Sequence, residues 1–372
     1  MNIQNLIQCA KGVNDPRRIY GNIRHVLEDV LVIGLISMLC GGKDFSDMEV
    51  LGKAKESWLR GFLSLPNGVP DSDTFRRIFE KVNPAELSKC LCEWIKTERS
   101  IGTVKNIHLD GKTACSSGND YHTAYHIVSA WASEYGITLG QVSVDEKSNE
   151  ITAIPQLLDI IDIKGAVVTI DAMGCQKKIA ALIVCHEADY LFTLKANHKN
   201  LYKQVKSLFA DIDAGNTENC LDTCSQNIHA HGRIETRIVD CISANLVTSK
   251  DDWQNLQTIV RIRYNAMCVK TGKETSQTRY FLTSLPTSAR RISGVIKSHW
   301  SIESTLHWSL DVIFEEDKSK AKKDNSQANL SALRKLALSI LLPNKQGRLS
   351  LKKMMFRAAL EQDYLEMVLF GM

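Results

Sequence analysis

The spacing of apolar residues changes near residue 105, and this change divides the chain into two regions. Before it, apolar residues recur at helical intervals between turn signals such as Gly41-Gly42 and Asn83-Pro84. After it, short apolar runs alternate with helical segments until about residue 196. The pattern therefore predicts an all-helical region up to about residue 100, followed by an α/β region.

Two helices of the first region begin at capping signals. Ser46-Asp-Met-Glu49 fits a capping box, and Asp71 precedes a helix that carries Arg76 and Arg77 near its beginning. Short helices with a basic pair are typical either of a small packed bundle or of a helix-turn-helix that reads DNA. Arg76 and Arg77 are therefore candidate DNA contacts, although a single basic pair is a weak signal.

The α/β region begins with three predicted strands, of which His126–Ala132 and Ile137–Val144 form a hairpin. A helix, the strand Val167–Ile170, a second helix and the strand Asp189–Lys195 follow. Three meandering strands followed by alternating helices and strands is the order of a ribonuclease-H-like fold, a mixed sheet flanked by helices. In that fold the first and fourth strands are neighbours.

The pattern changes again after residue 198. We predict a β-rich insertion over about 199–287, with strands at Ile234–Ile242, Leu256–Val269 and Gln277–Ser284. Amphipathic helices are predicted at Asn329–Leu342 and Leu351–Leu369. The expected domains are a helical domain (1–100), an α/β domain with its insertion (101–340) and a helical tail (341–372).

Two predicted strands end on an aspartate. Asp110 ends the first strand and is followed by Gly111, and Asp171 ends the strand Val167–Ile170 before a turn at Gly174. Ligands bind at the carboxyl ends of strands in open α/β sheets, so both aspartates are candidates for chemistry. Each alone could equally be a helix cap or a turn residue. The adjacency of the first and fourth strands would bring them together.

A third carboxylate emerges from the helical spacing of Ala289 to Phe314. At about 100° per residue, Glu303 lies inside the apolar stripe of this helix and is expected to face the core. A buried carboxylate is costly without a partner. Two explanations stay open: His299, one turn earlier, donates a hydrogen bond to Glu303, or Glu303 shares a metal with the two aspartates. The stripe consists of Ile292, Val295, Ile296, Ile302, Leu306, Leu310 and Ile313.

Composition limits the function classes without choosing among them. The 372 residues are 44% hydrophobic with a net charge of +4, which permits binding to a polyanion but does not require it. The most apolar run, Val30 to Cys40, is too short to cross a bilayer and predicts a buried helix. Eleven scattered cysteines without a secretory leader favour reduced thiols in a cytoplasmic protein.

Two other clusters have more than one interpretation. Cys220, Cys224, His229 and His231 have some resemblance to a zinc cluster, but their spacing fits no standard template, so coincidence is favoured. A basic run at Lys318, Lys320, Lys322 and Lys323 is either a solvated face or a contact to a phosphate backbone.

Several ordered motifs extend over nearly the whole chain: Asp110-Gly-Lys112, Glu146–Ile151, Thr169–Gln176, His231–Glu235, and His299–Glu303 with Leu306-His-Trp308. Together they are similar to those of the H-repeat-associated family of insertion-sequence DDE transposases. The resemblance implies a helical leader domain, a ribonuclease-H-like catalytic domain with a β insertion, and an acidic catalytic triad that binds the metal. The acids of that triad are Asp110, Asp171 and Glu303.

The third acid of the wider group is accompanied by a tyrosine, an arginine and a downstream lysine. Ile296, His299 and Leu310 hold those places here. The resemblance therefore leaves open which residues grip the scissile phosphate. Lys112 and His299, together with nearby lysines, are the candidates.

The activity implied is metal-dependent phosphodiester cleavage and strand transfer of an insertion element. Two Mg²⁺ ions, or Mn²⁺ in their place, would stabilise the charge that develops on phosphate from about 4 Å apart. The expected partners are the element ends and target DNA, bound by a homo-oligomer. One alternative is a DNA-binding remnant without activity. Another is a haloacid-dehalogenase-like phosphohydrolase, which is disfavoured because its nucleophilic aspartate would stand at His108.

Overall fold

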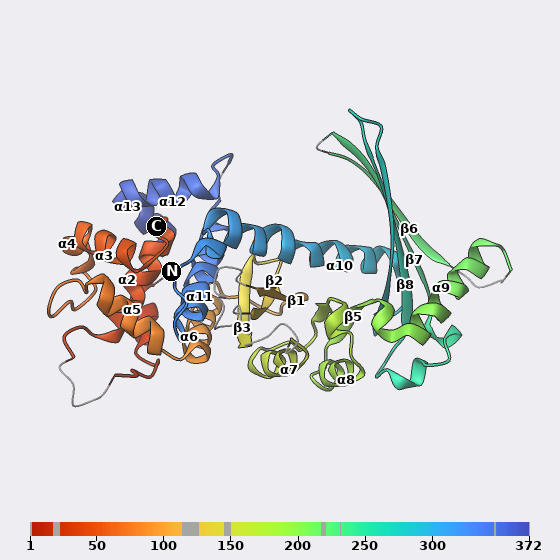
Figure 1. Ribbon diagram of the computed structural model, residues 1–372, viewed down its shortest axis with the longest axis horizontal. Coiled ribbons are helices and arrows are strands. Elements are labelled where there is room, and N and C mark those ends of the chain that lie inside the picture. Colours follow the sequence, from red (N-terminus) through yellow and green to blue (C-terminus); the bar gives the residue numbers. More distant parts are fainter. Residues whose placement is uncertain are drawn as a thin grey trace. The chain divides into compact units, whose positions relative to one another are not determined.

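The computed structural model describes residues 2–17, 23–113, 126–144, 150–216, 221–230, 232–345 and 347–371. By their internal contacts, these residues form two compact units (Figure 1). The first unit comprises Met1–Gly102, Gly111–Ile161 and Ile302–Met372, and the second comprises Thr103–Asp110 and Asp162–Ser301. The boundary passes between Asp110 and Gly111, within one strand. The domain boundaries expected near residues 100 and 340 stay a prediction.

The N-terminal region is helical, as the sequence predicts. Its apolar run becomes helix α2, which is buried almost throughout. The helices of this region are α1 (Ile3–Ala10), α2 (Leu27–Leu39), α3 (Phe45–Ala54), α4 (Glu56–Leu59), α5 (Ser72–Lys81) and α6 (Pro84–Glu98).

The starts of these helices follow local capping chemistry. The side chains of Asp71 and Asn83 accept hydrogen bonds from backbone N–H groups in the first turns of α5 and α6. The capping box predicted at Ser46 is wrong by two residues, because Asp44 caps α3 instead. Asp44 has extended backbone, and its carboxylate reaches the N–H groups of both Ser46 and Asp47.

Helix α11 (Ser326–Leu341) is the central helix of the first unit. All of its residues are buried, and it packs against α2, α5, α6 and strand β3. The helix predicted at Asn329–Leu342 is confirmed, but its expected exposed polar face is wrong, because its polar residues find partners inside the unit. The side chain of Asn329, for example, donates to the backbone carbonyls of Phe79 and Val82.

The C-terminal segment forms two helices where one was predicted. Helix α12 (Leu351–Leu360) and helix α13 (Gln362–Phe370) are separated at Glu361, whose backbone is extended. Across the ranges that the structure describes, we find no helix with the length and apolar character needed to cross a membrane.

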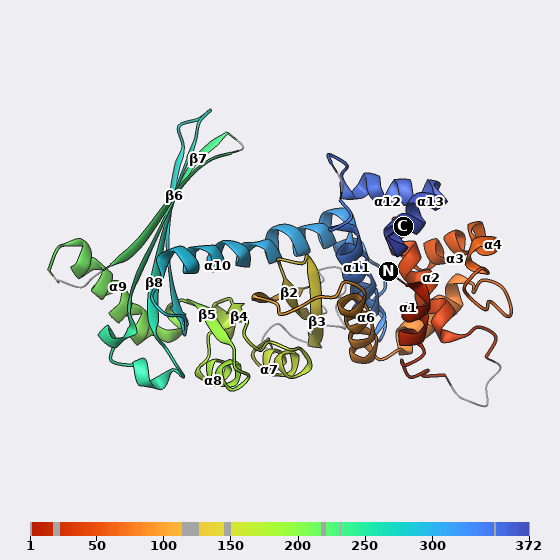
Figure 2. The same cartoon turned by 180° about the vertical axis from the view of Figure 1, so that it is seen from behind.

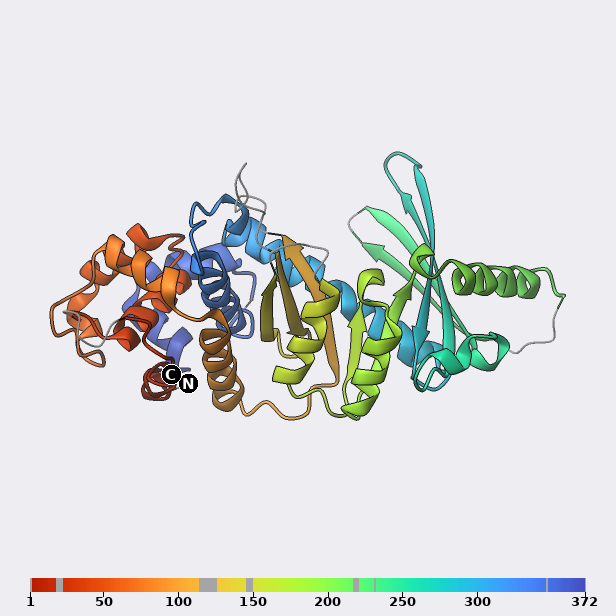
Figure 3. The same ribbon diagram turned by 60° about the horizontal axis from the view of Figure 1, so that its bottom comes forward.

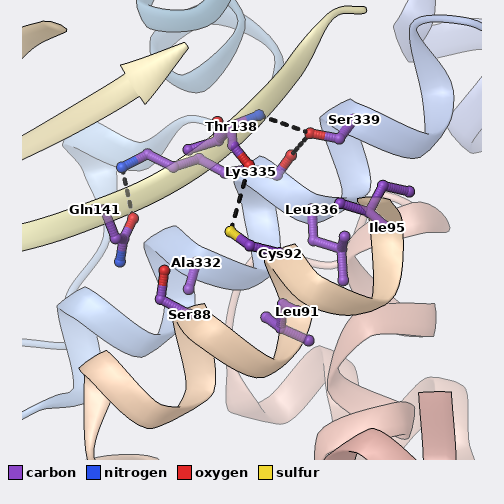
Figure 4. A pocket seen from close by; sticks show the side chains of 10 residues that line it. All are labelled: Ser88, Leu91, Cys92, Ile95, Thr138, Gln141, Ala332, Lys335, Leu336 and Ser339. Carbon is purple, nitrogen blue, oxygen red and sulfur yellow. Dashed lines mark hydrogen bonds between the residues drawn. The ribbon is translucent and has the colours of Figure 1, made fainter. Parts of the chain in front are cut away.

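A small cavity of about 20 Å³ lies between α6, β3 and α11 in the first unit (Figure 4). Lys335 lines it, and its ammonium donates to Gln141 at 2.7 Å and to Ser129 at 2.8 Å. The thiol of Cys92 donates to the carbonyl of Thr138 on the opposite wall. Burial lowers the pKa of Lys335 to about 8.

Nine strands form one mixed sheet in the order β3-β2-β1-β4-β5-β9-β8-β7-β6. The hairpin β2–β3 is antiparallel, whereas β1, β4 and β5 run parallel to one another. This confirms the predicted ribonuclease-H-like order, with the first and fourth strands adjacent (Figure 3). The strands are β1 (Asn106–Thr113), β2 (His126–Ala132), β3 (Ile137–Val144), β4 (Val167–Ile170), β5 (Asp189–Leu194), β6 (Asp222–Ala230), β7 (Arg233–Ser243), β8 (Thr258–Cys268) and β9 (Glu274–Thr283).

The β-rich insertion is confirmed and has one more strand than the sequence predicts. Strands β6 to β9 are antiparallel, and β9 joins them to β5. Of these strands, β6, β7 and β8 are labelled in Figure 2. The prediction missed β6 because its residues are mostly polar and show little apolar alternation. The helices that flank the strands are α7 (Glu150–Ile160) in the first unit and α8 (Lys177–Cys185), α9 (Lys199–Asp213) and α10 (Ala289–Ser301) in the second.

Helix α10 covers one face of this insertion. Its residues Ile292, Val295 and Ile296 belong to a buried cluster with Val239 of β7 and Ile262 of β8. The apolar stripe read from the sequence is therefore the side by which α10 packs on the sheet. Burial of each such side chain contributes on the order of 1.5–3 kcal/mol.

Candidate functional site

Asp110 and Asp171 lie where the parallel pairing of β1 and β4 ends. Asp171 directly follows β4, whereas β1 continues past Asp110 to Thr113, so the prediction that Asp110 ends its strand is wrong. In the register of β1 and β4, Leu109 pairs with Ile170, and each aspartate is the next residue along its strand. Asp110 is half-buried, and the side chain of Asp171 is 54% exposed. The structure thus brings together the two aspartates that the sequence singled out, at the edge of the sheet where ligands bind.

Lys195 joins this edge from the third parallel strand. It directly follows β5, which pairs with β4, and its ammonium lies 3.7 Å from the Asp171 carboxylate. Both side chains are more than half exposed, so this ion pair contributes little to stability. Lys195 was not among the candidate site residues, although its place at the end of the predicted strand Asp189–Lys195 is the same signal that identified Asp171.

Behind the aspartates lies a string of three hydrogen-bonded side chains. The Thr169 hydroxyl lies 2.7 Å from Nδ1 of His108 and 2.7 Å from Nδ1 of His299. His108 and Thr169 each stand two residues before an aspartate, so each lies on the same face of its strand as that aspartate. His299 belongs to α10, so the string connects this helix to both aspartate-bearing strands.

Burial keeps both imidazoles neutral. It lowers the pKa of His108 to about 3 and the pKa of His299 to about 4. The Thr169 hydroxyl has only one hydrogen, so it donates to one Nδ1 and accepts from the other. One histidine therefore carries its proton on Nδ1 and the other on Nε2. A hydrogen bond from His299 to Glu303 was one of the two explanations left open for a buried Glu303. Nδ1 of His299 forms its hydrogen bond with Thr169 instead.

Glu303 is exposed, so its predicted position on the core face is wrong. The apolar part of that prediction is correct, because Ile302, Leu306 and Leu310 are fully buried. The α-helix ends at Ser301, and the chain continues in π-helical turns, η7 (Ile302–His307) and η8 (Ser309–Ile313). A π-helical turn is wider than an α-helical turn, so residues four apart in the sequence lie on one face. Glu303, one residue after Ile302, therefore lies off the apolar stripe. Glu303 belongs to the first unit and the two aspartates to the second.

Lys112 is held by carboxylates. Its ammonium lies 2.7 Å from Asp311, 2.9 Å from Asp317 and 3.5 Å from Glu316, and its side chain is 12% exposed. Burial alone would lower the pKa of Lys112, but the three carboxylates raise it above its ordinary value. The role of Lys112 as a phosphate contact stays a prediction.

Gly111, between Asp110 and Lys112, occupies a position without room for a side chain. A Cβ there would overlap the imidazole of His126 and the carboxylate of Glu150, which lie 2.6 Å from each other. The glycine of the Asp-Gly-Lys motif is thus explained by close packing within the first unit.

The two arginines of α5 differ in their ion pairs and in their exposure. Arg76 binds Asp73 at 3.0 Å and Glu80 at 2.8 Å. Arg77 is 67% exposed and lies 3.9 Å from Asp73. DNA contact by either arginine stays a prediction, and Arg77 is the one whose guanidinium is more accessible.

Within the described ranges, no group of three or more histidine, cysteine, aspartate or glutamate side chains is placed to hold a metal. Cys220 and His231 lie outside those ranges. Cys224 and His229 both lie on β6, whose register with β7 is unbroken, and their odd spacing directs them to opposite faces. For Mg²⁺, the two aspartates offer the oxygen ligands that it prefers, so they fit as part of a site.

The comparisons with known proteins agree with this architecture. A family profile described as "Transposase DDE domain" matches residues 95–340, and one described as "DDE_Tnp_1-associated" matches residues 7–95. The chain is 32% identical to the "H repeat-associated putative transposase YhhI" of Escherichia coli K12, over 100% of this chain and 99% of that protein. It is 33% identical to the "Putative transposase YncI" of Escherichia coli O157:H7, over 99% of this chain and 95% of that protein.

A solved structure, a piggyBac transposase synaptic complex with hairpin DNA, is also similar, with a TM-score of 0.43 and 12% identity over 99% of this chain and 79% of that chain. The full-length relatives confirm the similarity to H-repeat-associated transposases that the motifs indicate. The chain belongs to the family of transposases that carry a DDE domain.

Proposed function

We propose that this protein is a metal-dependent DNA transposase that cleaves the ends of an insertion element and joins them to target DNA. The observation that supports this most directly is the placement of Asp110 and Asp171 on adjacent parallel strands at the ligand-binding edge of the sheet. Family membership supports the same reaction class. The substrates are the element ends and the target DNA, which a homo-oligomer would hold together in the cytoplasm.

Asp110, Asp171 and Glu303 are proposed to hold two Mg²⁺ ions, or Mn²⁺ in their place. When bound, these ions stabilise the negative charge that develops on the phosphate, the attacking oxygen and the leaving oxygen. The exposure of Glu303 is compatible with this role, because Mg²⁺ keeps several waters and both metal and DNA must reach the carboxylate. Three carboxylates with their waters form an oxygen-only site without histidine or cysteine ligands.

The neighbouring side chains have supporting roles. Lys195 lies close enough to Asp171 to contact a phosphate oxygen bound at this edge, as a point charge. His299 is neutral near pH 7, so it would offer a hydrogen bond rather than a charge to the DNA. Thr169 fixes the orientation of its ring. Arg76 and Arg77 remain candidate DNA contacts.

The reaction is proposed to have two steps. Water first attacks the phosphodiester at the end of the element, which releases a 3′-hydroxyl. That hydroxyl then attacks a phosphodiester of the target DNA. A new P–O bond forms, and the bond from that phosphorus to the target's 3′-oxygen breaks and releases a 3′-hydroxyl. The same acids would serve both steps, because each is an in-line displacement at phosphorus.

The test uses the purified full chain and a duplex that carries the inverted repeats bracketing its gene. With Mg²⁺ we expect a nick at the repeat boundary with a free 3′-hydroxyl, and no nick with EDTA. A shuffled repeat serves as the control substrate. Binding to the repeat without cleavage in Mg²⁺ or Mn²⁺ would instead identify an inactive DNA-binding remnant.

A further inference from the structure

Lys112 occupies an unusual place for a residue near a DNA-binding edge. Three carboxylates surround its ammonium within 3.5 Å, and little of the side chain reaches solvent. An ammonium group has three hydrogens to donate, and three carboxylates can use all of them. Contact with a phosphate would therefore require the lysine to leave partners that it already has.

The carboxylates come from the chain segment that follows Glu303. Asp311 lies in η8, and Glu316 and Asp317 lie in η9 (Glu316–Lys318). Lys112 lies near the end of β1, two residues after Asp110. All of these contacts are internal to the first unit. They join the end of β1, the strand that contains Asp110, to the chain segment that follows Glu303.

Two further cations fasten the same segment. Arg334 of α11 lies 3.5 Å from Glu316, which is 2% exposed, and Lys43 lies 2.7 Å from Glu315. Glu315 has a left-handed backbone with φ of +53°, which turns the chain between η8 and η9. Without Lys112, Asp311, Asp317 and the buried Glu316 would lie together with less compensating charge. Lys112 is thus one of three cations that hold this segment in place.

We propose that Lys112 is a positioning residue of the transposition site. It fastens the segment from Ser309 to Lys318 to the end of β1, and so sets where the π-helical turns present Glu303. It acts through this segment and does not touch the DNA. The inference rests on the proposed function, because it assigns Lys112 a task in building that site.

The first test separates positioning from phosphate contact. Lys112→Met is compared with wild type and with Lys53→Met, which removes an exposed lysine that pairs with Glu49. Lys112→Met should bind the end-containing duplex with a Kd within about twofold of wild type and the same salt dependence, while Mg²⁺-dependent cleavage falls by at least about a hundredfold. A weaker Kd with a salt slope lower by about one would identify a phosphate contact and overturn the inference.

Lys112→Arg is the conservative variant. It keeps a cation among the three carboxylates, so it should recover cleavage to within about tenfold of wild type. Cleavage as low as that of Lys112→Met, in a folded protein, would count against a charge-based attachment. Asp311→Asn and Asp317→Asn approach the same contact from the other side, without changing β1. The double variant should show a loss of cleavage similar to that of Lys112→Met.

A readout that does not depend on strand cleavage uses Fe²⁺ in place of Mg²⁺. Hydrogen peroxide and ascorbate are added: the bound Fe²⁺ reduces peroxide to hydroxide and a hydroxyl radical, ascorbate restores Fe²⁺, and the radicals cut the polypeptide nearby. In wild type we expect cuts near Asp110, Asp171 and Glu303, and in Lys112→Met only the cut near Glu303 should disappear. If Lys112→Met kept all three cuts and cleaved DNA as well as the wild type, this inference would be overturned, but the proposed function would not. A wild-type chain that gives no cuts and no DNA cleavage would overturn the proposed function, and this inference with it.

Discussion

Leu109 and Ile170 are register partners in the parallel pair of β1 and β4, and one residue further along stand Asp110 and Asp171. Neighbouring strands lie about 4.8 Å apart, so residues in equivalent positions on them are close enough to share a metal or a phosphate. Backbone pairing therefore sets the spacing of the two aspartates.

The first prediction concerns the three acids. Asp110→Asn, Asp171→Asn and Glu303→Gln should each abolish Mg²⁺-dependent cleavage, because an amide binds Mg²⁺ more weakly than a carboxylate does. Folding should be nearly unchanged, since these side chains are exposed or half-buried. Cleavage assays with circular dichroism as a folding control provide the measurement. Near-wild-type cleavage by one variant would remove that residue from the triad.

The second prediction concerns the string behind the aspartates. Thr169→Val removes the hydroxyl that satisfies Nδ1 of both His108 and His299, and should lower the free energy of unfolding by about 1–3 kcal/mol. Thr169→Ser keeps the hydroxyl and should lose much less. Urea denaturation of the three proteins gives the comparison. Equal stability of the valine variant and wild type would show that the string contributes nothing to folding.

A third prediction concerns the pH dependence of stability and Lys335. The pKa of Lys335 is lowered to about 8 by burial, whereas a lysine in the unfolded chain keeps its ordinary value of 10.5. Between these values the unfolded chain binds more protons, so stability contributed by this group rises with pH. Below pH 8 the lysine is charged in both states and the burial penalty is fully present.

The measurement is the free energy of unfolding at pH 7.5 and 10 for wild type and Lys335→Met. The wild type should gain up to about 3 kcal/mol relative to the variant on going to the higher pH. The variant corrects for the other groups that titrate in this range. A difference that stays constant, or that shrinks with rising pH, would contradict a depressed lysine pKa.

The fourth prediction concerns a buried ion pair of the insertion. Arg261 binds Asp240 at 2.8 Å and Asp213 at 2.6 Å, and Arg261 and Asp240 are almost fully buried. Arg261→Met should cost about 3–5 kcal/mol, because it leaves the Asp240 carboxylate buried with weaker compensation. Arg263→Met removes a more exposed partner of the same carboxylate and is the matched control, with a much smaller expected loss. Similar losses of unfolding free energy in both variants would show that burial does not decide how much each ion pair contributes to stability.

Much of the fold was predictable because its signals are local. Asp71 and Asn83 cap their helices with their own side chains, and the hairpin of β2 and β3 is recognisable from two apolar runs around Gly136, whose φ is +64°. The first two candidate acids were equally accessible, since an aspartate that follows a short apolar run is visible in sequence. Their proximity needed only the order of the strands.

Other features depend on contacts between distant segments. Strand β6 has too little apolar alternation to be identified alone, and it is a strand because β7 pairs with it throughout its length. Helix α11 looks one-sided in sequence, yet its polar face is covered by other elements of the first unit. Neither outcome can be derived from the segment itself.

The sequence by itself determined the parallel strands, the two aspartates that follow their apolar runs and the apolar stripe of the Glu303 segment, because backbone preference and hydrophobic spacing are properties of neighbouring residues. Only the tertiary structure decided that Glu303 is exposed and that Lys112 lies among three carboxylates. Glu303 is exposed because π-helical turns shift the helical phase. Lys112 meets acids that are distant in the chain, such as Asp317, which is 205 residues away. Burial and charge pairing are set by what packs against a side chain, and that is fixed only when the whole chain folds.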